Sequence, residues 1–140
     1  MDHVLRFLKN HRICSLSILT EKGPHAAAMH YSHRDTPLAL FFSTDKNSRK
    51  TSGILKNGGA PASVVIGFSE GNMQTLQMDG TMRAVTDGDL QAAQAIHYAK
   101  ITESARYKDD PDTLFLAFEP HWVRFSNHKE DNPVLFEQEL

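Results

Sequence analysis

The order of the expected strands and helices constrains the fold of this chain more than any single motif does. Apolar and polar residues alternate from Arg12 to Thr20, which predicts a strand with Cys14, Leu16 and Ile18 on its buried face. Six segments are expected to form strands, at residues 12–20, 25–32, 38–43, 62–68, 75–85 and 113–126 with an interruption near Pro120. Three segments have apolar residues at helical spacing, at 4–9, 48–56 and about 86–107.

The strands therefore follow one another in runs and do not alternate regularly with helices. A doubly wound parallel sheet would need a strict strand–helix alternation. The sequence contains no Gly-x-Gly-x-x-Gly or Walker-type loop, which such a sheet would use for a nucleotide. The order predicts a small antiparallel barrel or sheet with peripheral helices.

Composition narrows the class of protein further. The 140 residues are expected to form a single domain over residues 1–140. The net charge of -2 gives no basic field for nucleic acid, and no stretch approaches the length of a membrane span. Cys14 is the only cysteine, so an intrachain disulfide is excluded and a cytoplasmic location is expected.

A candidate anion site follows the strand expected over 38–43. Two hydroxyl residues, Ser43 and Thr44, are followed by a polar turn, and Ser48-Arg49-Lys50 then opens a helix. Hydroxyl groups, free N–H groups at a helix start and two cations are the groups that bind a phosphate. The alternative is a solvated helix start that carries two cations. Cations at this end oppose the helix dipole, which favours a specific reason for their presence.

Three more segments give the chain a family resemblance. Gly23–Met29 has a Gly-Pro turn before a strand, Ala62–Gly67 is a β-branched strand after the helix, and Leu76–Val85 contains Gln77-x-x-Gly80. Together with the Ser-Thr and Ser-Arg-Lys segment, and in this order, they resemble the pyridoxamine 5'-phosphate oxidase-like family of FMN-binding split barrels. The resemblance covers about residues 5–126, which leaves a polar C-terminal tail over 127–140.

The resemblance implies a mainly β fold with peripheral helices, a six-stranded antiparallel split β-barrel of the FMN-binding type. It also implies a homodimer with one FMN in each of two clefts between the subunits. In that arrangement Arg49 and Lys50 would hold the FMN phosphate. Thr44 and Ser48 would donate hydroxyl hydrogen bonds to it.

The same resemblance implies a place for the flavin ring. The backbone of Ala27, Ala28 and Met29 would run along the isoalloxazine edge, with Ser43 at the end of the next strand. Gln77 would hydrogen-bond the ring or the ribityl chain, from its own or the other subunit. Small side chains suit this role because a flat ring must approach the backbone closely. The alternative for the alanine run is tight packing against a neighbouring helix.

The chain also departs from the pyridoxamine phosphate oxidases proper. Those enzymes carry an Arg in the strand occupied here by Ala26–Met29 and a Lys a few residues later, near Tyr31. Their C-terminal Arg-Leu-x-Pro-type segment is replaced by His121–Phe125. The vitamin B6 oxidase activity is therefore not transferred, and the chain looks more like the small bacterial members of the family.

Three functions of different class remain open. The first is a flavin-dependent oxidoreductase acting on a small molecule, with NADH or NADPH as electron donor and no identifiable catalytic side chain. The second is a split-barrel protein that holds flavin or haem without catalysis. A ligand-free barrel that serves as a dimeric interaction module is a third reading.

The eight histidines suggest a metal site only weakly. His25, His30 and His33 are close in sequence, but on one continuous strand His25 and His33 would share a face and His30 would take the other. No metal site is expected on these grounds. Cys14 has apolar strand neighbours and no activating cation nearby in sequence, so we expect an inert core thiol.

Overall fold

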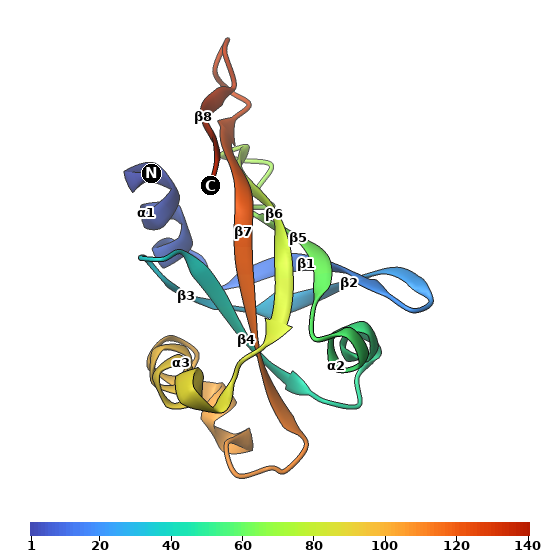
Figure 1. The fold of residues 1–140 in the computed structure, drawn as a ribbon. Coiled ribbons are helices and arrows are strands. Elements are labelled where there is room, and N and C mark those ends of the chain that lie inside the picture. The colour runs from blue at the N-terminus through green and yellow to red at the C-terminus, as the bar shows by residue number, and fades with distance from the viewer.

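The structure is a computed structural model that describes residues 1–140 as one curled antiparallel sheet with helices around it (Figure 1). Eight strands form the sheet: β1 (Ile13–Thr20), β2 (Gly23–His30), β3 (Ser32–Arg34), β4 (Ala39–Asp45), β5 (Ala60–Ile66), β6 (Gln74–Ala84), β7 (Thr113–Asn127) and β8 (Val134–Glu139). The helices are α1 (Asp2–Asn10), the 3-10 turn η1 (Arg49–Thr51), α2 (Ser52–Asn57), α3 (Asp87–Lys100) and the 3-10 segment η2 (Thr102–Tyr107).

The strand order is β2-β1-β5-β6-β7-β4-β3, with β8 added to β7 outside this path. Every pair is antiparallel, which confirms the predicted mainly β, split-barrel class. Two strands go beyond the expected six. The short β3 arises because the strand expected over 25–32 ends at His30, and β8 arises because part of the polar tail pairs with β7. No helix is long and apolar enough to cross a membrane.

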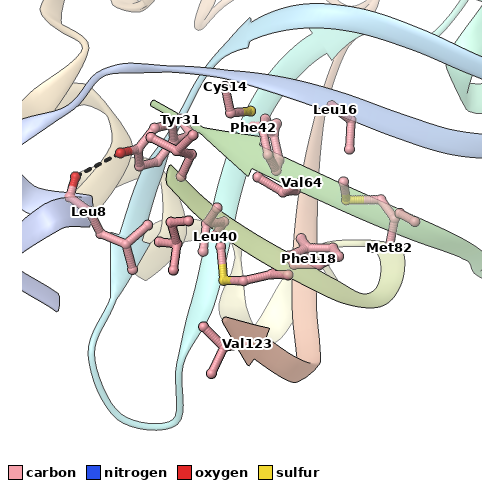
Figure 2. Packing of buried hydrophobic residues seen from close by; sticks show 14 of the residues in the cluster. Leu8, Cys14, Leu16, Tyr31, Leu40, Phe42, Val64, Met82, Phe118 and Val123 are labelled. Carbon is pink, nitrogen blue, oxygen red and sulfur yellow. Dashed lines mark hydrogen bonds between the residues drawn. The ribbon is translucent and has the colours of Figure 1, made fainter. Parts of the chain in front are cut away.

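One main core fills the concave side of the sheet. It contains 21 buried residues, including Cys14, Leu16 and Ile18 as the alternation of β1 predicts. Figure 2 shows Phe42 and Phe118 packed within this cluster, and Tyr31 reaching α1, where its hydroxyl donates to the Leu8 carbonyl at 2.8 Å. Each fully buried side chain of this size contributes about 1.5–3 kcal/mol.

A smaller cluster attaches α3 to the other face of the sheet. It joins Ala93 to Ala39, Phe41 and Ala117, so β4 and β7 are covered on both faces near their paired ends. This explains why the apolar run of β4 is continuous and does not alternate. The same cluster determines which side of α3 faces the sheet.

The helix expected over about 86–107 is wrong in its second half. The α-helix ends at Lys100, and Ile101 leaves helical geometry with φ -106° and ψ 72° while it stays 1% exposed. The helix therefore ends where Ile101 turns into the protein interior, and η2 begins at the next residue. The expected apolar stripe of Leu90, Ala93, Ile96 and Ala99 is also shifted, because the fully buried positions are Ala93 and His97.

The helix expected over 48–56 begins as η1 and continues as α2. Its predicted glycine stop is confirmed. Gly58 follows the last helical residue with φ 79° and donates its N–H to the Ile54 carbonyl at 2.8 Å. The left-handed conformation costs glycine little, so the chain can turn sharply into β5.

The interruption expected near Pro120 is a β-bulge. Asp79 pairs with Trp122 and Gly80 with Pro120, which leaves His121 unpaired on β7. A side-chain carbon on Gly80 would collide with the Glu119 carbonyl oxygen and the Pro120 Cα. The glycine of the Gln77-x-x-Gly80 motif is therefore required by close approach of two backbones.

We expect Gly80→Ala to lower the free energy of unfolding by about 2 kcal/mol, because backbone atoms opposite the bulge cannot yield as a flexible side chain would. Urea unfolding measures the change. Thr81→Ala, at the exposed neighbouring position, is the matched control and should change stability by less than about 0.5 kcal/mol. Equal effects of the two substitutions would contradict this account of Gly80.

Candidate functional site

The turn after β4 is held in a single conformation by its own hydrogen bonds. The Asn47 N–H binds the Asp45 carboxylate at 2.7 Å, and the Lys46 N–H binds the Asp112 carbonyl at 2.8 Å. The Thr51 hydroxyl donates to the Lys46 and Ser48 carbonyls, at 2.6 and 2.9 Å. The start of η1 is thereby fixed next to the end of β4.

This turn brings together the two hydroxyl groups predicted to bind phosphate. The oxygen atoms of Thr44 and Ser48 lie 3.5 Å apart, and both residues are half-buried. The two cations follow directly on η1. Arg49 is exposed and Lys50 is half-buried, and neither forms an ion pair with a carboxylate.

Partial burial of the charged Lys50 ammonium group costs free energy, and a bound anion would offset this cost. Burial lowers the pKa of its ammonium group, and the charge of Asp45 acts in the opposite direction. Lys46 in the same turn differs, because its ammonium lies 3.3 Å from the Asp112 carboxylate. A half-buried cation without a close counter-ion is a feature of anion sites.

The second group of predicted residues lines a cavity of about 290 Å³. Ala28 and Met29 border it from β2, and Ser43 borders it from β4. The remaining lining residues come from the end of β2, from α3 and from the segment after it: His30, His97, Ile101, Glu103, Ser104, Arg106 and Tyr107. The structure therefore brings Ala28, Met29 and Ser43 to one pocket, whereas Ala27 is not among its lining residues.

An adjoining cavity of about 320 Å³ extends this pocket toward the end of β4. It is lined by Ser43, Thr44, Asp45, Tyr107, Asp110 and Thr113. Ser43 and Tyr107 border both cavities, so the two form one recess with Tyr107 at its middle. An elongated ligand can run from the β2 edge to the Thr44 hydroxyl.

The alanine run itself is open to solvent on one face. Ala26 and Ala28 are exposed and Ala27 is half-buried, as expected of an edge strand with β1 as its only neighbour. The run is therefore not packed tightly against a helix. A flat ligand can approach the β2 backbone here without a side chain in its way.

Gln77 does not join this recess within one chain. Register places Gln77 on the exposed face, in a row that runs from Ala28 through Ser15 and Val65 to Gln77. Three strand spacings separate Ala28 from Gln77, about 14 Å across the sheet. The two residues also pair with distant positions of β7. Ser43 pairs with Phe115 and Gln77 pairs with Arg124, which lies nine residues, or about 30 Å, farther along that strand.

His97 forms a wall of the recess that the sequence analysis missed. Its Nδ1 lies 2.8 Å from the Ser32 hydroxyl, its ring meets Phe115 edge-on at 5.6 Å, and the residue is 1% exposed. Burial, with the charges of His30 and Lys100, lowers the pKa of His97 to about 4. The imidazole is neutral at neutral pH.

The η2 wall was also missed, because it is held by contacts between distant parts of the chain. Arg12 forms an ion pair with Glu103. Lys100 donates to the Leu8 carbonyl at 2.9 Å and lies 4.2 Å from the centre of the Tyr31 ring. Burial lowers the pKa of Lys100 to about 8. No local pattern around residue 103 signals these partners.

The three neighbouring histidines do not lie on one continuous strand, contrary to the expectation from sequence. His25 and His30 lie on β2, whereas His33 lies on β3, where its Nε2 is 3.0 Å from the Asp35 carboxylate. The Cys14 expectation is confirmed. The thiol is fully buried, and burial raises its pKa to about 12.

Comparison with known proteins decides the family. A model described as pyridoxamine 5'-phosphate oxidase matches residues 1–127 of this chain. The chain belongs to the pyridoxamine 5'-phosphate oxidase family. Within known sequences, it is 25% identical to general stress protein 26 of Bacillus subtilis over 134 residues, 96% of this chain and 93% of that protein.

Solved structures support the same fold for this family member. A protein of Clostridium acetobutylicum related to general stress protein 26 has a TM-score of 0.73 and 17% identity, over 99% of this chain and 93% of that one. A haem-binding protein from Mycobacterium smegmatis has a TM-score of 0.71 and 18% identity, over 85% of this chain. This chain covers 50% of that longer protein.

The buried His97 should make stability depend on pH. Its folded pKa of about 4 lies below the unfolded value of 6.5, so the unfolded chain binds more protons between these two pH values. The stabilisation that comes from neutral His97 should be fully present above pH 6.5, and the free energy of unfolding should fall as the pH drops toward 4. Between pH 7 and 5 the loss is about 2 kcal/mol.

Urea unfolding of the native protein and of His97→Asn at both pH values measures this contribution. The substituted amide can still accept the Ser32 hydroxyl hydrogen bond but does not titrate. The native protein should lose about 2 kcal/mol more than the variant on acidification. Equal losses would show that His97 is not the group responsible.

Proposed function

We propose that this protein binds FMN at the interface of a homodimer and uses it as a flavin-dependent oxidoreductase on a small molecule. The observation that carries the proposal is the recess in which Ala28, Met29 and Ser43 meet, next to the hydroxyl pair of Thr44 and Ser48. Residues from β2, from β4 and from the turn before η1 thereby form one elongated binding surface.

In this proposal the phosphate is held by hydroxyl groups and cations. Thr44 and Ser48 each supply one O–H donor, and their 3.5 Å separation lets both reach one phosphate. Arg49 and Lys50 supply positive charge, and neither forms an ion pair, although the charge of Asp45 acts on Lys50. No cation reaches this end from Ala26–Met29, so Arg49 and Lys50 carry the charge themselves.

The ring end of the recess suits a flat conjugated group. Ala27, Ala28 and Met29 present an edge-strand backbone with small side chains, and edge N–H and C=O groups are free to bind a ligand. Ser43 and Tyr107 border the middle of the recess. FMN, when bound, supplies hydride or electron transfer, and the protein supplies orientation and shape.

The chain's own residues define where a substrate can approach. His30, Arg106 and Ser104 line the part of the recess beyond Met29, and they give it hydrogen-bonding groups and positive charge. His97 is neutral and engaged with Ser32, so it shapes this wall without donating a charge. NADH or NADPH as electron donor and a cytoplasmic location, which suits the lone reduced cysteine, remain part of the proposal.

The position of Gln77 is the reason for proposing a homodimer. It lies about 14 Å from Ala28 on the exposed sheet face, too far to contact the part of a ligand that lies on Ala28. This face carries short side chains around it, including Ser15, Ser17 and Ser63. A second copy packed on this face would bring its Gln77 to the first copy's flavin.

A haem- or flavin-binding protein without catalysis is the second candidate. It is favoured by the likeness to a haem-binding protein of Mycobacterium smegmatis and by the loss of two cations relative to the oxidases. Visible absorption of the freshly purified protein distinguishes bound flavin from bound haem. Reduction of bound flavin by NADH or NADPH, followed by reoxidation with an acceptor, distinguishes an oxidoreductase from a carrier.

We expect Arg49→Ala combined with Lys50→Ala to weaken FMN binding, with each lost charge-assisted contact worth about 1.5–3 kcal/mol. Quenching of flavin fluorescence on titration measures affinity. Lys56→Ala is the control, since Lys56 lies at the end of α2 and pairs with Glu21 at 2.9 Å. Unchanged affinity in the double variant would overturn the phosphate assignment.

Mixed dimers test whether Gln77 acts across the interface. A Gln77→Ala subunit paired with an Arg49→Ala, Lys50→Ala subunit should regain one FMN site of native affinity, because that site draws its cations and its glutamine from different chains. The matched homodimers should have no such site. If Gln77 acts within its own chain, the mixed dimer regains nothing, and a protein that sediments as a monomer would exclude the interface outright.

A further inference from the structure

A separate cavity lies at the far end of β7 from the flavin recess. It has a volume of about 290 Å³ and is lined from α1, β6, β7 and β8 by His3, Arg6, Phe7, Asn10, His11, Gln74, Phe125 and Leu135. The recess is bordered by Thr113 and this cavity by Phe125, at opposite ends of the strand. Figure 1 shows α1 beside the end of β7 that carries β8, away from α3.

The floor of this cavity is aromatic and rigid. Phe7 and Phe125 are each 6% exposed and meet edge-to-face with ring centres 5.1 Å apart. The His11 ring stacks on Phe7 at 4.0 Å. Gly67, with φ 99°, lies so close to the Phe7 ring that a side chain there would collide with it. The Phe7 ring is therefore tightly packed against the Gly67 backbone.

The rim is basic and contains no carboxylate. Arg6, His3 and His11 line it, and none of the six ion pairs in the protein involves them. Glu137 of the β7–β8 hairpin is engaged elsewhere, because Arg124 donates to its carboxylate at 3.1 Å. The His11 Nδ1–H donates to the Phe7 carbonyl at 2.8 Å, which holds the ring and leaves Nε2 free.

A β-bulge supplies the apolar side of the opening. Phe136 pairs with Phe125 and Val134 with Ser126, so Leu135 has no partner on β7. The bulge turns Leu135 to the cavity while the residue stays 48% exposed. An exposed leucine facing an unpaired arginine across an aromatic floor is an amphipathic opening.

We propose that this cavity binds a small organic anion that carries an aromatic ring. The ring would pack against the apolar floor formed by Phe7, Phe125 and the His11 ring. The Arg6 guanidinium would donate hydrogen bonds to the anionic group, because its planar fork suits a carboxylate or a phosphate. The Asn10 and Gln74 side chains offer further hydrogen bonds. The site is independent of FMN and shares no lining residue with the recess.

Isothermal titration of the full-length protein with four probes tests the ligand class. Benzoate and phenyl phosphate should bind saturably at one site per chain. Inorganic phosphate lacks the ring and benzyl alcohol lacks the charge, so each should bind at least about tenfold more weakly. Equal binding of inorganic phosphate and phenyl phosphate, or no saturable binding of any probe, would overturn the proposal.

Two matched pairs of variants locate the site. Arg6→Gln should weaken benzoate binding about tenfold, the loss of one charge-assisted contact, whereas Lys9→Gln on the same helix should not. Leu135→Glu places a negative charge at the opening and should abolish binding, whereas Val134→Glu, one residue away and outside the cavity, should not. Equal effects within either pair would overturn the assignment. FMN affinity should be unchanged in all four variants, so failure here is separable from failure of the flavin proposal.

Discussion

The hydrogen-bond ladder of β7 is the constraint on which the rest of the structure depends. Its first half pairs with β4, its second half with β8, and nearly its whole length with β6. It pairs with β6 along one edge and with β4 and then β8 along the other, and the bulge at His121 bends the strand between these last two partners. Gly80 on β6 allows the two backbones to approach closely at that point. Both candidate binding sites are built at the ends of this strand, one beside Thr113 and one beside Phe125.

Much of the fold could be predicted because its local signals agree with its final contacts. Alternation along β1 gave Cys14, Leu16 and Ile18 as core residues, and the glycines after Asn57 marked the end of α2. The predictions failed where a long-range contact overrides a local pattern. Nothing near Ile101 in the sequence signals that its burial ends α3, and β8 forms in a polar tail because β7 offers it an unpaired edge. The short β3 similarly depends on β4 as its partner.

The same distinction between local signals and long-range contacts applies to the candidate site. Thr44 and Ser48 could be placed together from sequence because a short turn joins them, and Ala28 could be placed beside Ser43 through the family resemblance. The η2 wall could not be placed, since Arg12 and Glu103, the ion pair that holds it, are 91 residues apart. Gln77 shows the limit of motif reasoning in another way. Its motif fixes a strand and a glycine, but only the register shows that it stands on the exposed face, away from the recess.

Some cations of this chain are occupied by contacts within the fold, and others remain available to a ligand. Lys46, Lys56, Arg83 and Arg124 each face a carboxylate, and Lys100 is held by a carbonyl and an aromatic ring. Arg6, Arg49 and Lys50 have no carboxylate partner, although the chain as a whole carries a net charge of -2. Other exposed cations, such as Lys9 and Lys22, also form no ion pair. Arg6 differs from them because it borders an aromatic cavity, and Arg49 and Lys50 differ because they follow the hydroxyl pair of Thr44 and Ser48. The hydroxyl pair followed by Arg49 and Lys50, and the aromatic cavity bordered by Arg6, are therefore the two places where we expect this fold to bind an anion.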